Sequence, residues 1–102
     1  MSEFDILTQL LRDFAEERDW EKFHTPKNLA MALAGEAGEL VAEFQWLTPT
    51  ESERSGLSPE QLAAVAMEIA DVQIYLLRLA DVLGLDVPAV VREKLEINRT
   101  RF

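Results

Sequence analysis

The sequence predicts an all-α protein whose protomer resembles a four-helix bundle. Apolar residues recur every three or four positions along nearly the whole chain, and no segment alternates as a strand does. Capping residues followed within two positions by proline mark helix starts at Thr25, Ser58 and Asp86. Hydrophobic residues make up 48% of the 102, which suffices for a packed core and excludes a disordered acidic tail. We expect one domain over residues 1–102.

Four helices follow from these signals. Ser2 caps the first helix, and Gly84 ends the third. The turn-rich residues 48–58 form a loop that serves as a connector or a lid. Gly35 and Gly38 interrupt the second helix, where they would permit the close approach of another helix beside the acids described below. The expected helices cover about residues 3–17, 26–47, 59–83 and 86–99.

Charge and composition exclude several classes of function. The chain carries 19 acidic and 10 basic side chains, a net charge of -9, so it offers no basic patch to a nucleic acid polymer. It has no cysteine and one histidine, which excludes disulfides, thiolate zinc sites, cysteine nucleophiles and multi-histidine metal sites. The first residues lack the basic region of a signal peptide, and no uncharged run could span a membrane. We therefore expect a cytoplasmic protein with no membrane partner.

The second helix carries isolated carboxylates. From residue 29 to residue 47 the only charged side chains are Glu36, Glu39 and Glu43, and nearly all the others are apolar. Their spacing puts all three on one face of a helix, and a helix that is apolar around its circumference is buried. We therefore expect these acids to point into an interior seam. Three roles stay open for Glu43: ligand of an additional cation, support for the other acids, or an exposed surface residue.

The third helix repeats this arrangement with Glu68 and Asp71, three residues apart among apolar neighbours. Unpaired buried carboxylates are costly, and hard divalent cations such as Mg²⁺ compensate them through oxygen ligands. Two alternatives are solvated helix faces and pairing with Lys or Arg from a neighbouring helix. A ferritin-like di-iron site would need Glu-x-x-His pairs, but the only histidine, His24, lies outside both helices.

The four acids form a known pattern. Glu36-Ala-Gly-Glu39 followed by Glu68-Ile-Ala-Asp71 has the form ExxE…ExxD, which resembles the all-α nucleotide pyrophosphohydrolases of the MazG-like superfamily. This resemblance implies that Glu36, Glu39, Glu68 and Asp71 hold Mg²⁺, with Mn²⁺ as a substitute. It also implies hydrolysis of a nucleoside triphosphate at the α-phosphorus to the monophosphate and pyrophosphate. We expect the metal or one carboxylate to activate the water, and Glu36 or Glu39 to be that catalytic carboxylate.

Three further segments are similar to one branch of that superfamily, the dCTP pyrophosphatases. They are residues 14–29 (FAEERDWEKFHTPKNL), 43–46 (EFQW) and 94–102 (KLEINRTRF). The resemblance implies dCTP or a modified dCTP as substrate, in a house-cleaning role in the nucleotide pool. A dUTP-directed or broad-specificity hydrolase stays open, as does a non-catalytic helical module that binds a nucleotide or a cation. Animal members carry a histidine about where this chain has Leu11.

Large planar side chains are the candidates for binding the base. Trp20, His24 and Trp46 lie near the ends of the first two helices, and bases stack on such faces. The alternative is that both tryptophans are core or interface residues. Tyr75 follows Asp71 by one helical turn, so its ring can wall the same cavity.

Basic and amide side chains are the candidates for binding the phosphates. On the fourth helix, Lys94, Asn98 and Arg101 share one face. They resemble the K…N…R ending of the family, which contacts the nucleotide or its phosphates. Lys27, at the start of the second helix, is a weaker phosphate candidate.

We expect a homo-oligomer, a tetramer built from dimers. A helix in a four-helix protomer shows only part of its surface to its partners, whereas the second helix is apolar all round. Large exposed apolar patches mark interfaces, and the residues away from the glutamates are Met31, Ala34, Val41 and Ala42. Symmetric association would let residues of one chain complete the pocket of another. The family resemblance also implies a tetramer.

Overall fold

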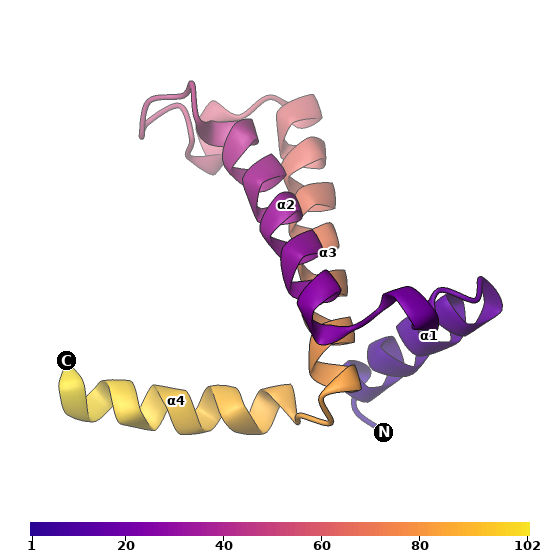
Figure 1. Ribbon diagram of the computed structural model, residues 1–102. Helices are drawn as coiled ribbons and strands as arrows, with labels where there is room; N and C mark the ends of the chain where they lie inside the picture. The colour runs from indigo at the N-terminus through magenta and orange to yellow at the C-terminus, as the bar shows by residue number, and fades with distance from the viewer.

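The computed structural model of residues 1–102 contains four α-helices and no strand (Figure 1). The helices are α1 (Glu3–Glu17), α2 (Pro26–Phe44), α3 (Pro59–Val82) and α4 (Val87–Arg101), and short 3-10 turns lie at Glu21–Phe23 and Arg54–Gly56. Helical residues make up 77% of the chain, so the all-α prediction is confirmed. Only the helix ends differ: α2 ends at Phe44 rather than at about residue 47, and α4 continues to Arg101. No helix is both long enough and apolar enough to cross a membrane.

Each helix begins where the sequence places a cap. The hydroxyl groups of Ser2 and Ser58 accept backbone N–H groups in full capping boxes, and Thr25 and Asp86 each accept one backbone N–H. Such caps satisfy donors that the first turn of a helix leaves free. The helix starts are therefore determined by residues adjacent to them in the chain.

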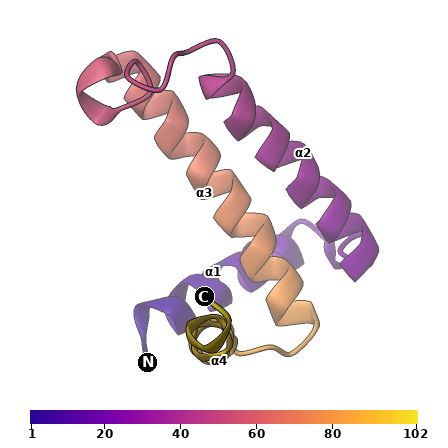
Figure 2. The same ribbon diagram turned by 90° about the vertical axis from the view of Figure 1, so that its left-hand side faces the viewer.

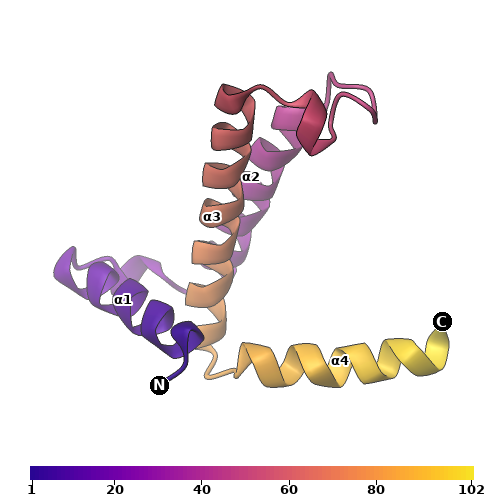
Figure 3. The ribbon, with the colours of Figure 1, turned by 180° about the vertical axis from the view of Figure 1, so that it is seen from behind.

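The helices are arranged around α3. α2 and α3 lie side by side as an antiparallel pair and form the main contact between helices (Figures 1 and 2). α1 packs against α3, with Leu7, Leu10 and Leu11 facing Ile74 and Leu77. α4 leaves the end of α3 on the side away from α1 and projects from the other helices (Figure 3). The fourth helix of the expected bundle is present, but it does not pack on the other three within one chain.

This arrangement leaves the chain extended. Its radius of gyration is 16.2 Å, whereas a compact domain of this length has about 13 Å. Its accessible surface is 7603 Å², about 1,800 Å² more than a compact monomer of this mass exposes. Only 6 of 102 residues are buried. The residues expected at an interface, Met31, Ala34, Val41 and Ala42, are all exposed.

Two helices end in turns that use a left-handed residue. After α1 the residue is Asp19 (φ 55°), and after α3 it is Gly84 (φ 68°). In both turns the next residue donates its backbone N–H to a carbonyl five residues back, Trp20 to Ala15 and Leu85 to Ala80. These are Schellman motifs. The first places Trp20 beside α1, and the second turns the chain towards α4.

Gly84→Ala is expected to lower the free energy of unfolding by about 1 kcal/mol, because an L side chain disfavours the left-handed conformation. No atom lies within 4 Å of the position that a Cβ would take, so the cost arises in the backbone alone. Asp19→Gly relieves the left-handed conformation in the other turn but also removes the ion pair of Asp19 with Lys22, so any gain in stability should be smaller than the loss in Gly84→Ala. Urea unfolding at one protein concentration measures both. A Gly84→Ala chain as stable as the parent would contradict this account.

Candidate active site

Three carboxylates from α2 and α3 meet within the helix pair. Glu36 and Glu39 belong to α2 and Glu68 to α3, and one oxygen of each lies within 4.8 Å of the others. Asp71 follows Glu68 by one turn of α3 and lines a cavity together with Glu36. The structure therefore brings three of the four predicted metal ligands together and places the fourth beside them.

The cluster contains carboxylate oxygens that nothing in the chain satisfies. Glu36 Oε2 and Glu68 Oε2 are buried and accept no hydrogen bond. Partial burial, and then the charge of Glu39, raise the pKa of both Glu36 and Glu68 above the usual value. None of the five ion pairs of the chain involves these residues or Asp71. Pairing with Lys or Arg from another helix of the same chain therefore does not explain the cluster.

The donor set fits a hard divalent cation. Oxygen atoms are the only donors, and such sets suit Mg²⁺ or Mn²⁺ rather than softer metals. A cation would satisfy the two buried oxygens and offset the repulsion among the carboxylates. Glu39 is exposed, so the cluster is open to solvent on one side.

An aromatic cavity of about 210 Å³ adjoins the acids. The ring of Trp20 lies edge-on to Phe14, with centroids 5.6 Å apart and an interplanar angle of 73°, and its centroid is 6.4 Å from that of His24. The cavity is lined by Leu11, Phe14, Ala15, Trp20, His24, Glu36, Asp71, Ile74, Tyr75 and Arg78. Three of the predicted base-binding residues, Trp20, His24 and Tyr75, thus share one cavity with two of the predicted metal ligands.

Comparison with known proteins identifies the family. The sequence profile of the MazG-like family matches residues 32–102, which include all four acids and α4. The chain belongs to the MazG-like family. Human dCTP pyrophosphatase 1 is 48% identical over 96 residues, and the mouse protein of the same name is 45% identical over 96 residues. In both cases the alignment covers 94% of this chain and 56% of the relative, so the chain spans little more than half of the length of these relatives.

A solved structure supports the fold over the whole chain. A pyrophosphatase from Archaeoglobus fulgidus superimposes on this MazG-like chain with a TM-score of 0.91 at 38% identity. The superposition covers 100% of this chain and 94% of the other. The all-α architecture, including the projecting α4, is therefore shared with an experimentally determined structure.

Other predicted contacts lie away from the cavity in this MazG-like chain. Trp46 follows α2 and is 87% exposed, and Lys27 is exposed in the first turn of α2. Lys94, Asn98 and Arg101 lie on α4, which projects from the rest of the chain (Figures 1 and 3). None of these five residues lines the cavity beside the acids.

The structure places Glu43 near the acidic cluster and Leu11 at the cavity, two residues whose roles the sequence alone left open. The charge of Glu43 contributes to the raised pKa of Glu68, after burial and the charges of Glu39 and Asp71, so Glu43 lies close enough to act on the cluster. Leu11 lines the cavity, so its position faces the candidate base site. In this chain that position offers an apolar side chain.

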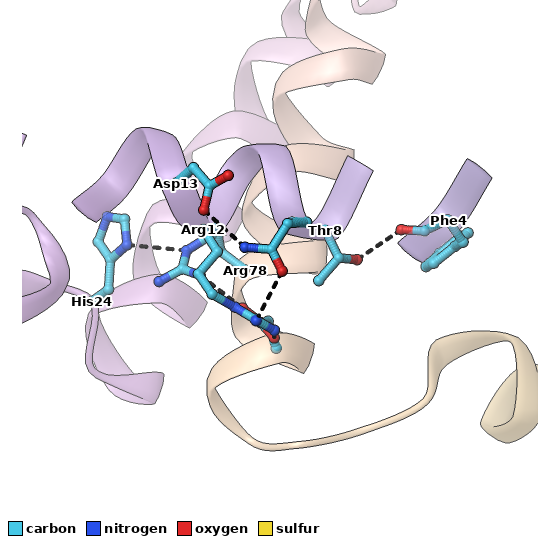
Figure 4. Close-up of polar contacts among 8 residues, drawn as sticks. Phe4, Thr8, Arg12, Asp13, His24 and Arg78 are labelled. Carbon is cyan, nitrogen blue, oxygen red and sulfur yellow. Dashed lines mark hydrogen bonds and ion pairs between the residues drawn. The ribbon is translucent and has the colours of Figure 1, made fainter. Parts of the chain in front are cut away.

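The structure also reveals a polar network that sequence reasoning missed (Figure 4). Arg78 of α3 donates to Asp81 and to His24, and Asp81 accepts two further hydrogen bonds from Arg12 of α1. A signal for it exists in the sequence, because Arg78 is the only basic residue of α3 and lies on the same helix face as Tyr75.

Proposed function

We propose that this MazG-like chain is a divalent-metal-dependent nucleoside triphosphate pyrophosphohydrolase that converts dCTP, or a modified dCTP, to the monophosphate and pyrophosphate. One observation carries the proposal: two buried carboxylate oxygens without a partner lie in an acidic cluster beside an aromatic cavity. The names of the human and mouse relatives and of the Archaeoglobus protein support the same chemistry.

The residues have three roles, which are to hold the cation, to bind the base and to activate water. Glu36, Glu39, Glu68 and Asp71 hold Mg²⁺, or Mn²⁺ in its place, while Trp20, His24 and Tyr75 surround the base. The cation, when bound, neutralises charge on the triphosphate oxygens and orients them. Glu36 or Glu39 accepts a proton from the water that attacks the α-phosphorus. The family resemblance supplies the choice of phosphorus atom.

The proposed enzyme is a homo-oligomer, a tetramer of two dimers, in which α4 of one chain contributes to the site of another. About 1,800 Å² of surface beyond that of a compact monomer is enough for a stable interface. Apolar side chains of α4 such as Val91 and Leu95 are uncovered. In a chain of net charge -9, α4 carries four basic and two acidic side chains, so it is attracted to the acidic face of a partner.

Through such an interface Lys94, Asn98 and Arg101 would reach the phosphates, and Trp46 and Lys27 would gain neighbours that one chain does not provide. The cytoplasmic location and the absence of nucleic acid polymers as partners stay predictions from composition.

We expect release of pyrophosphate from dCTP or 5-methyl-dCTP in the presence of Mg²⁺ and loss of that release on chelation. The assay compares dATP, dGTP, dCTP, dTTP, dUTP and 5-methyl-dCTP by kcat/KM and distinguishes pyrophosphate from orthophosphate. Equal kcat/KM on all of them, or a preference for dUTP, would contradict the proposed specificity and favour the broader or dUTP-directed hydrolase. Nucleotide binding without release of pyrophosphate would establish the non-catalytic module instead.

A further inference from the structure

Arg78 is the one buried charged residue of the chain, with 5% of its surface exposed. Its Nη1 donates to Asp81 Oδ2 at 3.0 Å. Its Nε donates to His24 Nδ1 at 3.3 Å (Figure 4). Asp81 is fixed from the other side, because Arg12 Nε and Nη2 donate to its two oxygens at 3.0 and 2.6 Å. The guanidinium of Arg78 therefore has one orientation, held by α1 and α3 together.

This contact determines which nitrogen of His24 carries the proton. A guanidinium has only donors and stays charged, so Nδ1 of His24 must present its lone pair. A neutral imidazole then carries its proton on Nε2. No protein group forms a hydrogen bond with Nε2, and the ring of His24 lines the aromatic cavity. His24 consequently offers one free N–H donor.

The charged groups around the ring favour its neutral form. Partial burial, and then the charge of Arg78, lower the pKa of His24, while Glu21, in the 3-10 turn between α1 and α2, acts in the opposite direction. The other charged side chains that line the cavity are Glu36 of α2 and Asp71 of α3. The guanidinium of Arg78 therefore fixes which nitrogen is the donor and, together with burial, favours the neutral ring.

We propose that Arg78 is a positioning residue for substrate selection, which holds His24 in the Nε2–H tautomer so that Nε2 donates a hydrogen bond to an acceptor on the edge of a pyrimidine base. The hydrogen bond to the base rests on the proposed function. The tautomer does not, because it follows from contacts within the chain. Through its contacts with Asp81, Arg12 of α1 also helps to hold Arg78 in place. The position of His24 therefore depends on how α1 packs on α3.

The tautomer can be read directly, because His24 is the only histidine of the chain. A long-range ¹H–¹⁵N spectrum of the imidazole should show one ring with Nδ1 unprotonated and Nε2 protonated. In Arg78→Met the ring should show averaged tautomers and should gain its second proton at a higher pH than in the parent. Arg54→Met, an exposed arginine in the loop between α2 and α3, is the matched control and should leave the spectrum unchanged. A parent spectrum with Nδ1 protonated, or an Arg78→Met spectrum identical to it, would overturn the assignment.

A double-mutant cycle tests whether Arg78 acts through His24. His24→Ala and Arg78→Met should each raise KM for the preferred nucleotide about tenfold, the effect of one lost hydrogen bond, with kcat changed by less than about twofold. The double variant should be no worse than His24→Ala alone. Multiplied effects would show that Arg78 acts independently, and would overturn the proposal.

Two controls cover a variant that unfolds and a parent chain that is inactive. Far-ultraviolet circular dichroism establishes that each variant keeps its helices. Arg78→Lys, which keeps the buried charge but not the planar fork, carries the same cycle if Arg78→Met loses its helical signal. If the parent chain hydrolyses no nucleotide, the proposed function fails, whereas the imidazole spectrum still decides the orientation of His24.

Discussion

Glu68→Gln is expected to lower kcat about a thousandfold while the chain stays folded, because several kcal/mol of transition-state stabilisation depend on the cation. The amide keeps the shape of the side chain but removes the charge of a residue whose Oε2 is buried without a partner. Glu39→Gln and Asp71→Asn should behave in the same way. Glu60→Gln, an exposed acid in the first turn of α3, is the matched control. Unchanged turnover in Glu68→Gln and Asp71→Asn would refute the assignment of the metal ligands.

The same variant should be more stable than the parent when no metal is present. Burial and neighbouring carboxylates raise the pKa of Glu68 in the folded chain above the ordinary 4.5. Between pH 4.5 and the raised pKa of Glu68, the folded state binds a proton that the unfolded state has released. The stability of the parent therefore falls as the pH rises through the raised pKa. Glu68→Gln removes this loss and also reduces the electrostatic repulsion on Glu36, its neighbour in the cluster. Urea unfolding in a chelator should therefore show a gain at neutral pH that shrinks below pH 4.5.

Added Mg²⁺ should reverse this order, because the cation stabilises only a folded state that can bind it. The midpoint of unfolding should then rise in the parent and in Glu60→Gln, and stay constant in Glu68→Gln. A parent chain whose stability does not respond to Mg²⁺ or Mn²⁺ would contradict the cation site even if the variant lost activity.

Local signals predicted the helices and the acidic cluster. Ser2, Thr25, Ser58 and Asp86 each cap the helix that follows them, because capping needs only residues three positions apart. Two acid pairs with helical spacing, each isolated in an apolar helix, could be expected to face each other once the two helices packed. The loop between α2 and α3 is short enough to make these helices antiparallel neighbours, and Glu36 and Glu68 do meet.

The features that local signals could not predict depend on where helices point. The pattern of α4 predicts a helix but not its direction, so Lys94 and Asn98 could not be placed relative to the acids. The contact between Arg12 and Asp81 joins residues 69 positions apart, and it depends on the crossing of α1 over α3. Beside Gly35 and Gly38, no atom of another helix lies within 4 Å of the position that a Cβ would take, so the close helix approach expected there does not come from the same chain.

Mixing two defective chains should restore activity, because the proposed site combines acids from one chain with α4 of another. Glu68→Gln chains are expected to be inactive, and Lys94→Ala/Asn98→Ala chains to be slower by about a hundredfold, through lost hydrogen bonds to charged phosphates. A mixed dimer regains one site with intact acids facing an intact α4. Random association of equal amounts should thus recover about a quarter of the parent activity.

The matched control is a mixture of Glu68→Gln with Glu39→Gln chains. Both changes fall on the acidic side of the site, on the adjoining helices α2 and α3 of one chain, so no combination of these chains assembles an intact cluster and the mixture should stay inactive. Native mass spectrometry establishes that mixed oligomers have formed and counts their chains. A complementary mixture that forms such oligomers without regaining activity would place Lys94 and Asn98 in the same site as their own chain's acids. α4 would then have to fold back from the direction in which it projects (Figure 3).

A single active species near 11.6 kDa would show that one chain suffices, and that the extra 1,800 Å² or so of exposed surface serves no interface that the reaction needs.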